Sequence, residues 1–160
     1  NIMVKTKDCL FDFDNFQISR GYIRLKEKGE GKIKGIDIIE GTGKYKGQNV
    51  GPYEGILNGK TYSLLPSPYI VLPKDEQELL AFHFVLSSDR KAEKFFIEIS
   101  ADKDFNFIFS FLQIDSNKFF PEQITLEALS KEYFFRVWYE DENSFSSMYS
   151  EVKKYKIPNN

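Results

Sequence analysis

Cysteine and histidine are almost absent from the sequence, which has one of each among its 160 residues. A single cysteine excludes an intramolecular disulfide, and one residue of each type excludes metal sites built from several cysteine or histidine ligands. Cys9 lies beside Leu10 and Phe11. We therefore expect a small buried side chain there, with an intermolecular disulfide as the alternative in an oxidising compartment.

Long apolar runs are also missing. No stretch of 18 apolar residues occurs, so we expect no membrane span in the chain. The chain begins Asn1-Ile2-Met3, without the basic and apolar regions of a secretory signal. Because position 1 is also not an initiator methionine, we expect a processed or excised piece of a longer protein, whose signal sequence would lie outside this chain.

Glycine is confined to the first part of the chain, because all ten glycines lie between Gly21 and Gly59. Residues 1–60 hold 11 basic and 8 acidic side chains, a balance of +3, whereas residues 61–160 hold 11 basic and 16 acidic ones, a balance of −5. Prolines at the junction favour extended backbone. These changes predict three parts: a glycine-rich β segment over 1–63, a proline-containing linker over 64–73 and a second domain over 74–160.

The overall charge favours neither sign strongly, since 22 basic and 24 acidic side chains give a net charge of −2. A nucleic-acid partner is not expected, because such a domain would be basic. Hydrophobic residues at 41% and charged residues at 29% are typical of a globular protein. The 16 phenylalanines and nine tyrosines are an unusually large aromatic share, which favours β-strands.

The second domain shows apolar residues at alternate positions, the pattern of strands with one buried face. These runs cover 80–86, 95–100, 105–111 and 133–139, and turn-forming residues separate them. Residues 124–134 contain good helix formers at helical spacing, but a strand fits the neighbouring pattern better. Strands about ten residues apart predict an antiparallel β-sandwich.

The first segment contains three shorter candidate strands, at 11–13, 22–25 and 33–39. Gly29-Glu30-Gly31 and Gly41-Thr42-Gly43 are predicted to form turns beside them. A unit of about 60 residues buries only about 60% of its unfolded surface. We therefore expect it to depend on the second domain or on sequence outside this chain.

Residues 95–105, Leu129 with residues 133–137, and residues 144–152 together resemble three stretches of a fibronectin type III-like sandwich. Residues 95–105, Phe-Phe-Ile-Glu-Ile-Ser-Ala-Asp-Lys-Asp-Phe, are similar to the family's strand C and the acidic turn after it. Leu129 with residues 133–137, Tyr-Phe-Phe-Arg-Val, resembles strand F, and residues 144–152 resemble the closing loop and strand G. The resemblance spans residues 66–158. It implies an all-β, antiparallel fibronectin type III or immunoglobulin-like fold.

Upstream, Gly21-Tyr22-Ile23-Arg24-Leu25 and Glu40-Gly41-Thr42-Gly43 resemble the end of a FecR-type β domain. The two resemblances together imply a bacterial, extracytoplasmic protein, periplasmic or envelope-associated. Such proteins often carry peptidoglycan-binding LysM domains, and any such domain would lie outside this chain. The implied function is a non-enzymatic adaptor or scaffold that binds another envelope protein and supports envelope integrity.

Motifs for chemistry are weak, and we expect no catalytic residue, cofactor or metal ion. Gly59-Lys60-Thr61 resembles the end of a phosphate-binding loop, but Glu54 stands where that motif needs glycine, so a tight turn is the better interpretation. Alternating acids such as Asp102 and Asp104 lack the spacing of a calcium loop. His83 lies within a candidate strand, and no neighbour in the sequence identifies it as a general base.

The candidate binding site is the second face of the strand at 133–139. If Tyr133, Phe135 and Val137 face the core, the alternate residues face outward. The expected outer aromatic face consists of Phe96, Phe134, Arg136 and Trp138. Three explanations remain open: residues 1–60 cover this face, a protein partner docks on it, or a glycan stacks on its rings, which would make the chain a carbohydrate-binding module.

Overall fold

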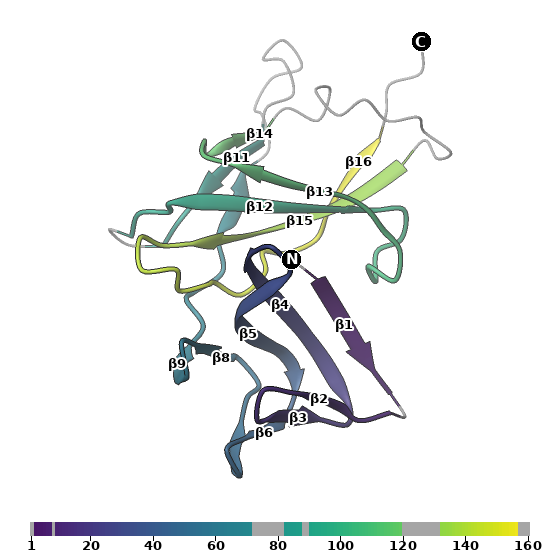
Figure 1. Ribbon diagram of the computed structural model, residues 1–160. Helices are drawn as coiled ribbons and strands as arrows, with labels where there is room; N and C mark the ends of the chain where they lie inside the picture. Colours follow the sequence, from purple (N-terminus) through teal and green to yellow (C-terminus); the bar gives the residue numbers. More distant parts are fainter. Residues whose placement is uncertain (1, 8, 72–81, 88–89, 120–131, 157–160) are drawn as a thin grey trace. The chain divides into compact units, whose positions relative to one another are not determined.

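The computed structural model describes residues 2–7, 9–71, 82–87, 90–119 and 132–156. It divides into two compact units, Asn1–Leu65 and Pro66–Asn160, and the division falls between Leu65 and Pro66 in the proline-containing stretch (Figure 1). In these residues every regular element is a strand, and all the strand pairs are antiparallel. The prediction of an all-β antiparallel fold is confirmed. No helix long and apolar enough to cross a membrane occurs in the described ranges.

The first unit contains two antiparallel sheets. Its strands are β1 (Ile2–Thr6), β2 (Phe11–Phe13), β3 (Phe16–Ile18), β4 (Gly21–Gly29), β5 (Lys32–Gly41), β6 (Gly43–Tyr45), β7 (Gln48–Val50), β8 (Glu54–Leu57) and β9 (Lys60–Ser63). One sheet has the order β1-β4-β5-β8-β9, and the other has the order β2-β3-β6-β7. The three predicted strands correspond to β2, β4 and β5, of which β4 and β5 are longer than the apolar pattern indicated.

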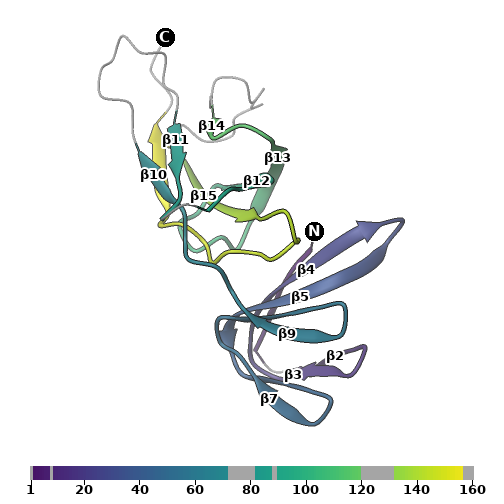
Figure 2. The same cartoon turned by 90° about the vertical axis from the view of Figure 1, so that its left-hand side faces the viewer.

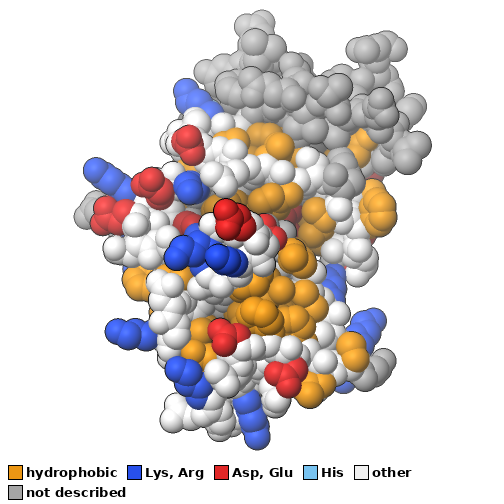
Figure 3. All heavy atoms as spheres, in the orientation of Figure 1, with side chains coloured by type: hydrophobic (Ala, Val, Ile, Leu, Met, Phe, Trp, Pro, Cys, Tyr) orange, Lys and Arg blue, Asp and Glu red, His pale blue; other side chains and the backbone are white. Residues whose placement is uncertain are grey.

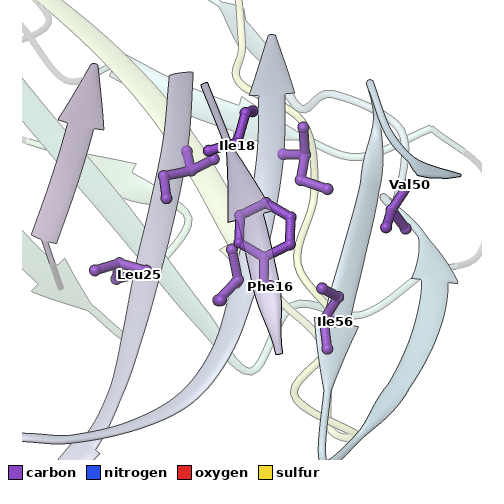
Figure 4. Close-up of a cluster of buried hydrophobic side chains, with 8 residues drawn as sticks. Phe16, Ile18, Leu25, Val50 and Ile56 are labelled. Carbon is purple, nitrogen blue, oxygen red and sulfur yellow. The ribbon is translucent and has the colours of Figure 1, made fainter. Parts of the chain in front are cut away.

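A compact apolar core lies inside the first unit (Figure 4). Strands of both sheets contribute to it, because alternate residues of each strand point to the same side. Its buried members are Phe16, Ile18, Ile23, Leu25, Ile36, Ile38, Val50 and Ile56. The Phe16 ring is fully buried among aliphatic side chains. The first unit therefore has a hydrophobic core of its own.

Four two-residue hairpin turns organise the first unit. Both residues of each turn have positive φ, the combination of a type I′ turn, which matches the twist of antiparallel strands. The four turns are Asp14-Asn15, Glu30-Gly31, Lys46-Gly47 and Asn58-Gly59. The predicted turns at Gly29–Gly31 and at Gly59 are thus confirmed.

Gly41 makes a different kind of turn, where the chain leaves one sheet and enters the other between β5 and β6. Its φ is 85°, and a Cβ there would collide with the carbonyl oxygen of Arg20. Only glycine fits this position without strain.

The second unit also contains two sheets (Figure 2). Its strands are β10 (Tyr69–Val71), β11 (Phe82–Val85), β12 (Lys94–Ser100), β13 (Ile108–Ile114), β14 (Lys118–Phe119), β15 (Glu132–Glu140) and β16 (Lys153–Lys156). The orders are β10-β11-β14 and β13-β12-β15-β16. Phenylalanine rings join the two sheets: Phe82 lies 4.7 Å from Phe135 and Phe84 lies 5.3 Å from Phe95, centroid to centroid.

The face of β15 predicted to be buried is buried, from Tyr133 to Tyr139. The run of phenylalanines from Phe105 to Phe111 is not one strand, however, because β13 begins at Ile108. The carboxylate of Asp102 accepts backbone N–H bonds from Asp104, Asn106 and Phe107, and these bonds hold the preceding residues in a loop. Phe105 has a φ of 53°, which no strand allows.

Two further predictions differ from the structure, and one lies outside it. Cys9 is exposed rather than buried. The predicted final strand within residues 144–152 is instead irregular, and the regular strand follows at β16. The predicted strand near residue 124 lies outside the described residues.

Candidate functional site

The four residues of the expected outer aromatic face lie on neighbouring strands of one sheet. Phe96 on β12 stands directly opposite Trp138 on β15, and Ser100 stands opposite Phe134. Between them, Glu98 is opposite Arg136. Directly opposite residues of an antiparallel pair share a face, so Phe96, Phe134, Arg136 and Trp138 are brought to the same side of the sheet.

Most of this face is buried in the structure. Trp138 has no exposed surface, and Phe96 is 4% exposed. The rings of Phe96 and Trp138 stack with centroids 4.1 Å apart and planes 14° apart, and Phe111 stacks on Phe96 at 5.8 Å. Phe134 is half-buried. Phe96 and Trp138 are therefore closed off and do not form an exposed flat platform for a sugar.

Arg136 is held by three residues that the sequence analysis did not connect to it. Its Nε and Nη2 atoms donate hydrogen bonds to Glu98 Oε1 at 3.1 and 2.8 Å. Its guanidinium lies between two aromatic rings, 4.1 Å from the centroid of Phe105 and 3.8 Å from that of Tyr149. Tyr149 also donates its hydroxyl proton to Glu98. A buried cation that is paired and stacked in this way has a structural role.

The segment at 146–150 places Tyr149 over Arg136. The backbone N–H groups of Ser147 and Ser150 donate to the carbonyls of Tyr139 and Val137, at 2.9 and 2.8 Å. The hydroxyl oxygens of the same serines accept the N–H groups of Tyr139 and Val137, at 3.0 and 2.9 Å. The two serines therefore pair with the edge of β15 through hydrogen bonds, although their segment is not a regular strand. The three-residue spacing of Ser147 and Ser150 is the sequence feature that could have indicated this arrangement.

A cleft of about 340 Å³ lies within the first unit. Isoleucines of the five-stranded sheet and aromatic rings of the four-stranded sheet supply its apolar lining, and residues of the hairpins supply its polar rim. The apolar lining includes Ile33, Ile36, Ile56, Phe13 and Tyr45, and the polar side chains are Asp14, Lys28, Lys34 and Asn58. Phe13 is 42% exposed. This volume lies near the lower end of the range for ligand pockets.

The cleft could not be predicted from the sequence because its walls come from separate hairpins. Asp14 and Asn58 lie in two of the type I′ turns, and Tyr45 is directly opposite Phe16 in the register of β3 and β6. Figure 3 shows apolar side chains reaching the visible surface of the first unit. The one usable signal was Phe13, an aromatic residue immediately before a turn.

The first unit also contains a buried charge cluster, formed by Arg24, Lys26, Asp37 and Tyr62. Asp37 Oδ2 accepts from Arg24 Nε at 2.9 Å, and Asp37 Oδ1 accepts from the Tyr62 hydroxyl at 2.7 Å. Lys26 Nζ lies 3.4 Å from Asp37 Oδ1 and donates to the Tyr62 hydroxyl at 2.9 Å. Burial alone would raise the pKa of Asp37, but the two cations and the hydrogen bonds outweigh it and lower the pKa.

Comparison with known proteins gives no family assignment. No protein-family model matches the chain, and no curated protein matches it in sequence.

Proposed function

We propose that this chain is a non-enzymatic adaptor of the bacterial cell envelope, located outside the cytoplasm, and that it binds another envelope protein. The observation that carries the proposal is the cleft of the first unit. Its apolar floor accepts an anchoring side chain of a partner, and its polar rim supplies orienting hydrogen bonds. We therefore place the proposed docking site at the cleft, and not on the buried face around Trp138.

The architecture of the second unit supports the fibronectin type III-like part of this proposal. Its sheets of three and four antiparallel strands pack through an aromatic interior, as in sandwich domains of cell-surface proteins. The proposal includes a FecR-like character for the first unit. It also includes a peptidoglycan-binding domain elsewhere in the parent protein, beside which the adaptor would support envelope integrity.

The environments of two buried acids, Asp37 and Glu98, support a non-catalytic role. A general acid at neutral pH needs a raised pKa, whereas the pKa of Asp37 is lowered by its cations. Glu98 is occupied by Arg136 and Tyr149. Both carboxylates therefore stabilise the fold.

The test compares capture of envelope proteins by the intact chain and by two variants. Phe13→Asp places a charge in the cleft, and Leu10→Asp is the control, because Leu10 is an exposed apolar residue of the same unit outside the cleft lining. We expect Phe13→Asp to lose the partner and Leu10→Asp to retain it. Equal capture by both variants would contradict the proposal.

A glycan is the second candidate ligand for the same cleft. The rings of Phe13 and Tyr45 are flanked by the carboxylate of Asp14 and the amide of Asn58, polar groups suited to sugar hydroxyls. Calorimetric titration with soluble peptidoglycan fragments separates the candidates. Binding that Asn58→Gly weakens would favour a carbohydrate-binding module, because glycine removes the amide and keeps the positive φ of the turn, and no binding would leave the protein partner.

A further inference from the structure

The edges of the sheets differ in how well they are protected against pairing with another strand. Natural proteins guard edge strands by making them short or by placing charges on them. Among the described strands, the edge strands are β1, β2, β7, β9, β10, β13, β14 and β16. All but β13 either carry a charged residue or have only three residues. At the opposite edge of the same sheet, β16 has the sequence Lys-Lys-Tyr-Lys.

Strand β13 is the unguarded exception. It has seven residues, Ile-Phe-Ser-Phe-Leu-Gln-Ile, without a charge, proline or glycine. It lies at the end of the order β13-β12-β15-β16, so none of the described strands pairs with its outer edge (Figure 1). Phe111, in the middle of the strand, is 38% exposed, and Gln113 is exposed. A long, uncharged and accessible edge of this kind favours strand addition.

We propose that β13 pairs antiparallel with β13 of a second copy of this chain, joining two four-stranded sheets into one sheet of eight strands. Two observations favour a second copy as the occupant. Identical strands meet without like-charge repulsion, because β13 carries no charge. Its two ends also match when its direction is reversed, since isoleucine stands at both, and the odd number of residues places Phe111 at the centre of such a pairing.

The proposed pairing has a defined register. Centred on Phe111, it places the Phe111 side chains of the two copies beside each other. Ile108 then lies opposite Ile114 of the second copy, and Ser110 lies opposite Leu112. Such an interface is isologous, since the same patch is used on both copies. It is separate from the cleft, so it does not depend on the proposed adaptor function.

Charge exchange at Phe111 tests the register directly. We expect the mass of the chain, measured by sedimentation equilibrium in reducing buffer, to rise with concentration from 18.7 kDa toward the dimer. Phe111→Lys and Phe111→Glu each place like charges opposite each other, and each should raise the dissociation constant at least about tenfold. An equimolar mixture of the two variants should dimerise again.

Val152→Lys is the matched control, because Val152 is an exposed apolar residue of the same unit outside β13. This variant should dimerise like the unchanged chain. An unchanged chain that stays monomeric at high concentration would overturn the proposal. Dimerisation that the Phe111 substitutions leave intact, or failure of the mixed variants to pair again, would also overturn it.

A cross-linking experiment guards against loss of folding in the charged variants, since Phe111 stacks on Phe96. In a Cys9→Ser background, Phe111→Cys should form a disulfide-linked dimer under mild oxidation, because directly opposed Cβ atoms lie within disulfide reach. Val152→Cys in the same background should not. Equal cross-linking at both positions would contradict the register.

Discussion

Asp37 is the residue on which the buried charge cluster of the first unit depends, because Arg24, Lys26 and Tyr62 all interact with its carboxylate. Replacing it by asparagine leaves two buried cations without their anion. We expect Asp37→Asn to lower the free energy of unfolding by about 3–5 kcal/mol, measured by urea denaturation. The control is Asp12→Asn, an exposed residue, which should change stability by less than about 0.5 kcal/mol. Equal losses for the two variants would refute this assignment.

The lowered pKa of Asp37 also predicts the pH dependence of stability. The carboxyl has a lower pKa in the folded chain than its ordinary value of 3.8. Its contribution is therefore complete above that value and is lost as the pH falls through the folded pKa. We expect the stability of the unchanged chain to fall more steeply below about pH 4 than that of Asp37→Asn. Parallel curves for the two proteins would contradict this.

Trp138 reports on its own burial, since it is the single tryptophan of the chain. Because it is fully buried and stacked on Phe96, its fluorescence should be blue-shifted and protected from iodide. Phe96→Ala should shift the emission to the red and cost about 3–5 kcal/mol of stability, measured from the same fluorescence during denaturation. Red-shifted, quenchable emission from the unchanged chain would show that the face is open.

At the scale of elements, the segment at 146–150 stabilises β15 through two serine hydroxyls. Ser150→Ala removes the oxygen that accepts the backbone N–H of Val137. Leaving a buried N–H without this acceptor should cost about 1–3 kcal/mol. The control is Ser116→Ala in an exposed turn, expected to have little effect, and thermal unfolding of both variants provides the comparison. A neutral Ser150→Ala would mean that water replaces the hydroxyl.

The elements show how far the sequence could predict the structure. Alternation placed Phe135 and Val137 on one face and Trp138 on the other, because strand periodicity is local. It could not show that Arg136 is enclosed by Phe105 and Tyr149, since these three residues come from distant segments. The alternation also predicted a strand that begins at Phe105. This was wrong because the carboxylate of Asp102 accepts backbone N–H bonds that hold those residues in a loop, and periodicity does not reveal such bonds.

The binding region was harder to predict for the same physical reason. The alternation left open whether the outward-facing aromatics are covered or exposed, because periodicity does not show that large rings lower their free energy by stacking on one another, as Phe96 and Trp138 do. The walls of the cleft in the first unit come from five strands, β2, β4, β5, β6 and β8, and from two hairpin turns. No single stretch of sequence contains that information, although Phe13 contributes to it.

For the whole molecule, the two proposals together describe a bivalent binder. Pairing through β13 would give an assembly with two clefts, one from each copy. If the partner presents two copies of its anchor within reach, the second binding event becomes intramolecular and its effective concentration rises. Binding to an immobilised partner should then be tighter for the unchanged chain than for Phe111→Lys. Surface plasmon resonance with the same concentration of clefts for both proteins measures the difference. Equal affinities would exclude this avidity.

The lysines of β16 determine how such an assembly ends. A sheet grows only through a strand edge that can accept a neighbour, and this sheet has one such edge at β13 and a positively charged one at β16. When two copies join through β13, neither copy has a free β13 edge. The two outer edges of the joined sheet are then both β16, whose lysines repel further strands. Growth stops at two. Replacing Lys153, Lys154 and Lys156 by threonine would leave each copy with two growing edges, and the closed pair would give way to open-ended filaments.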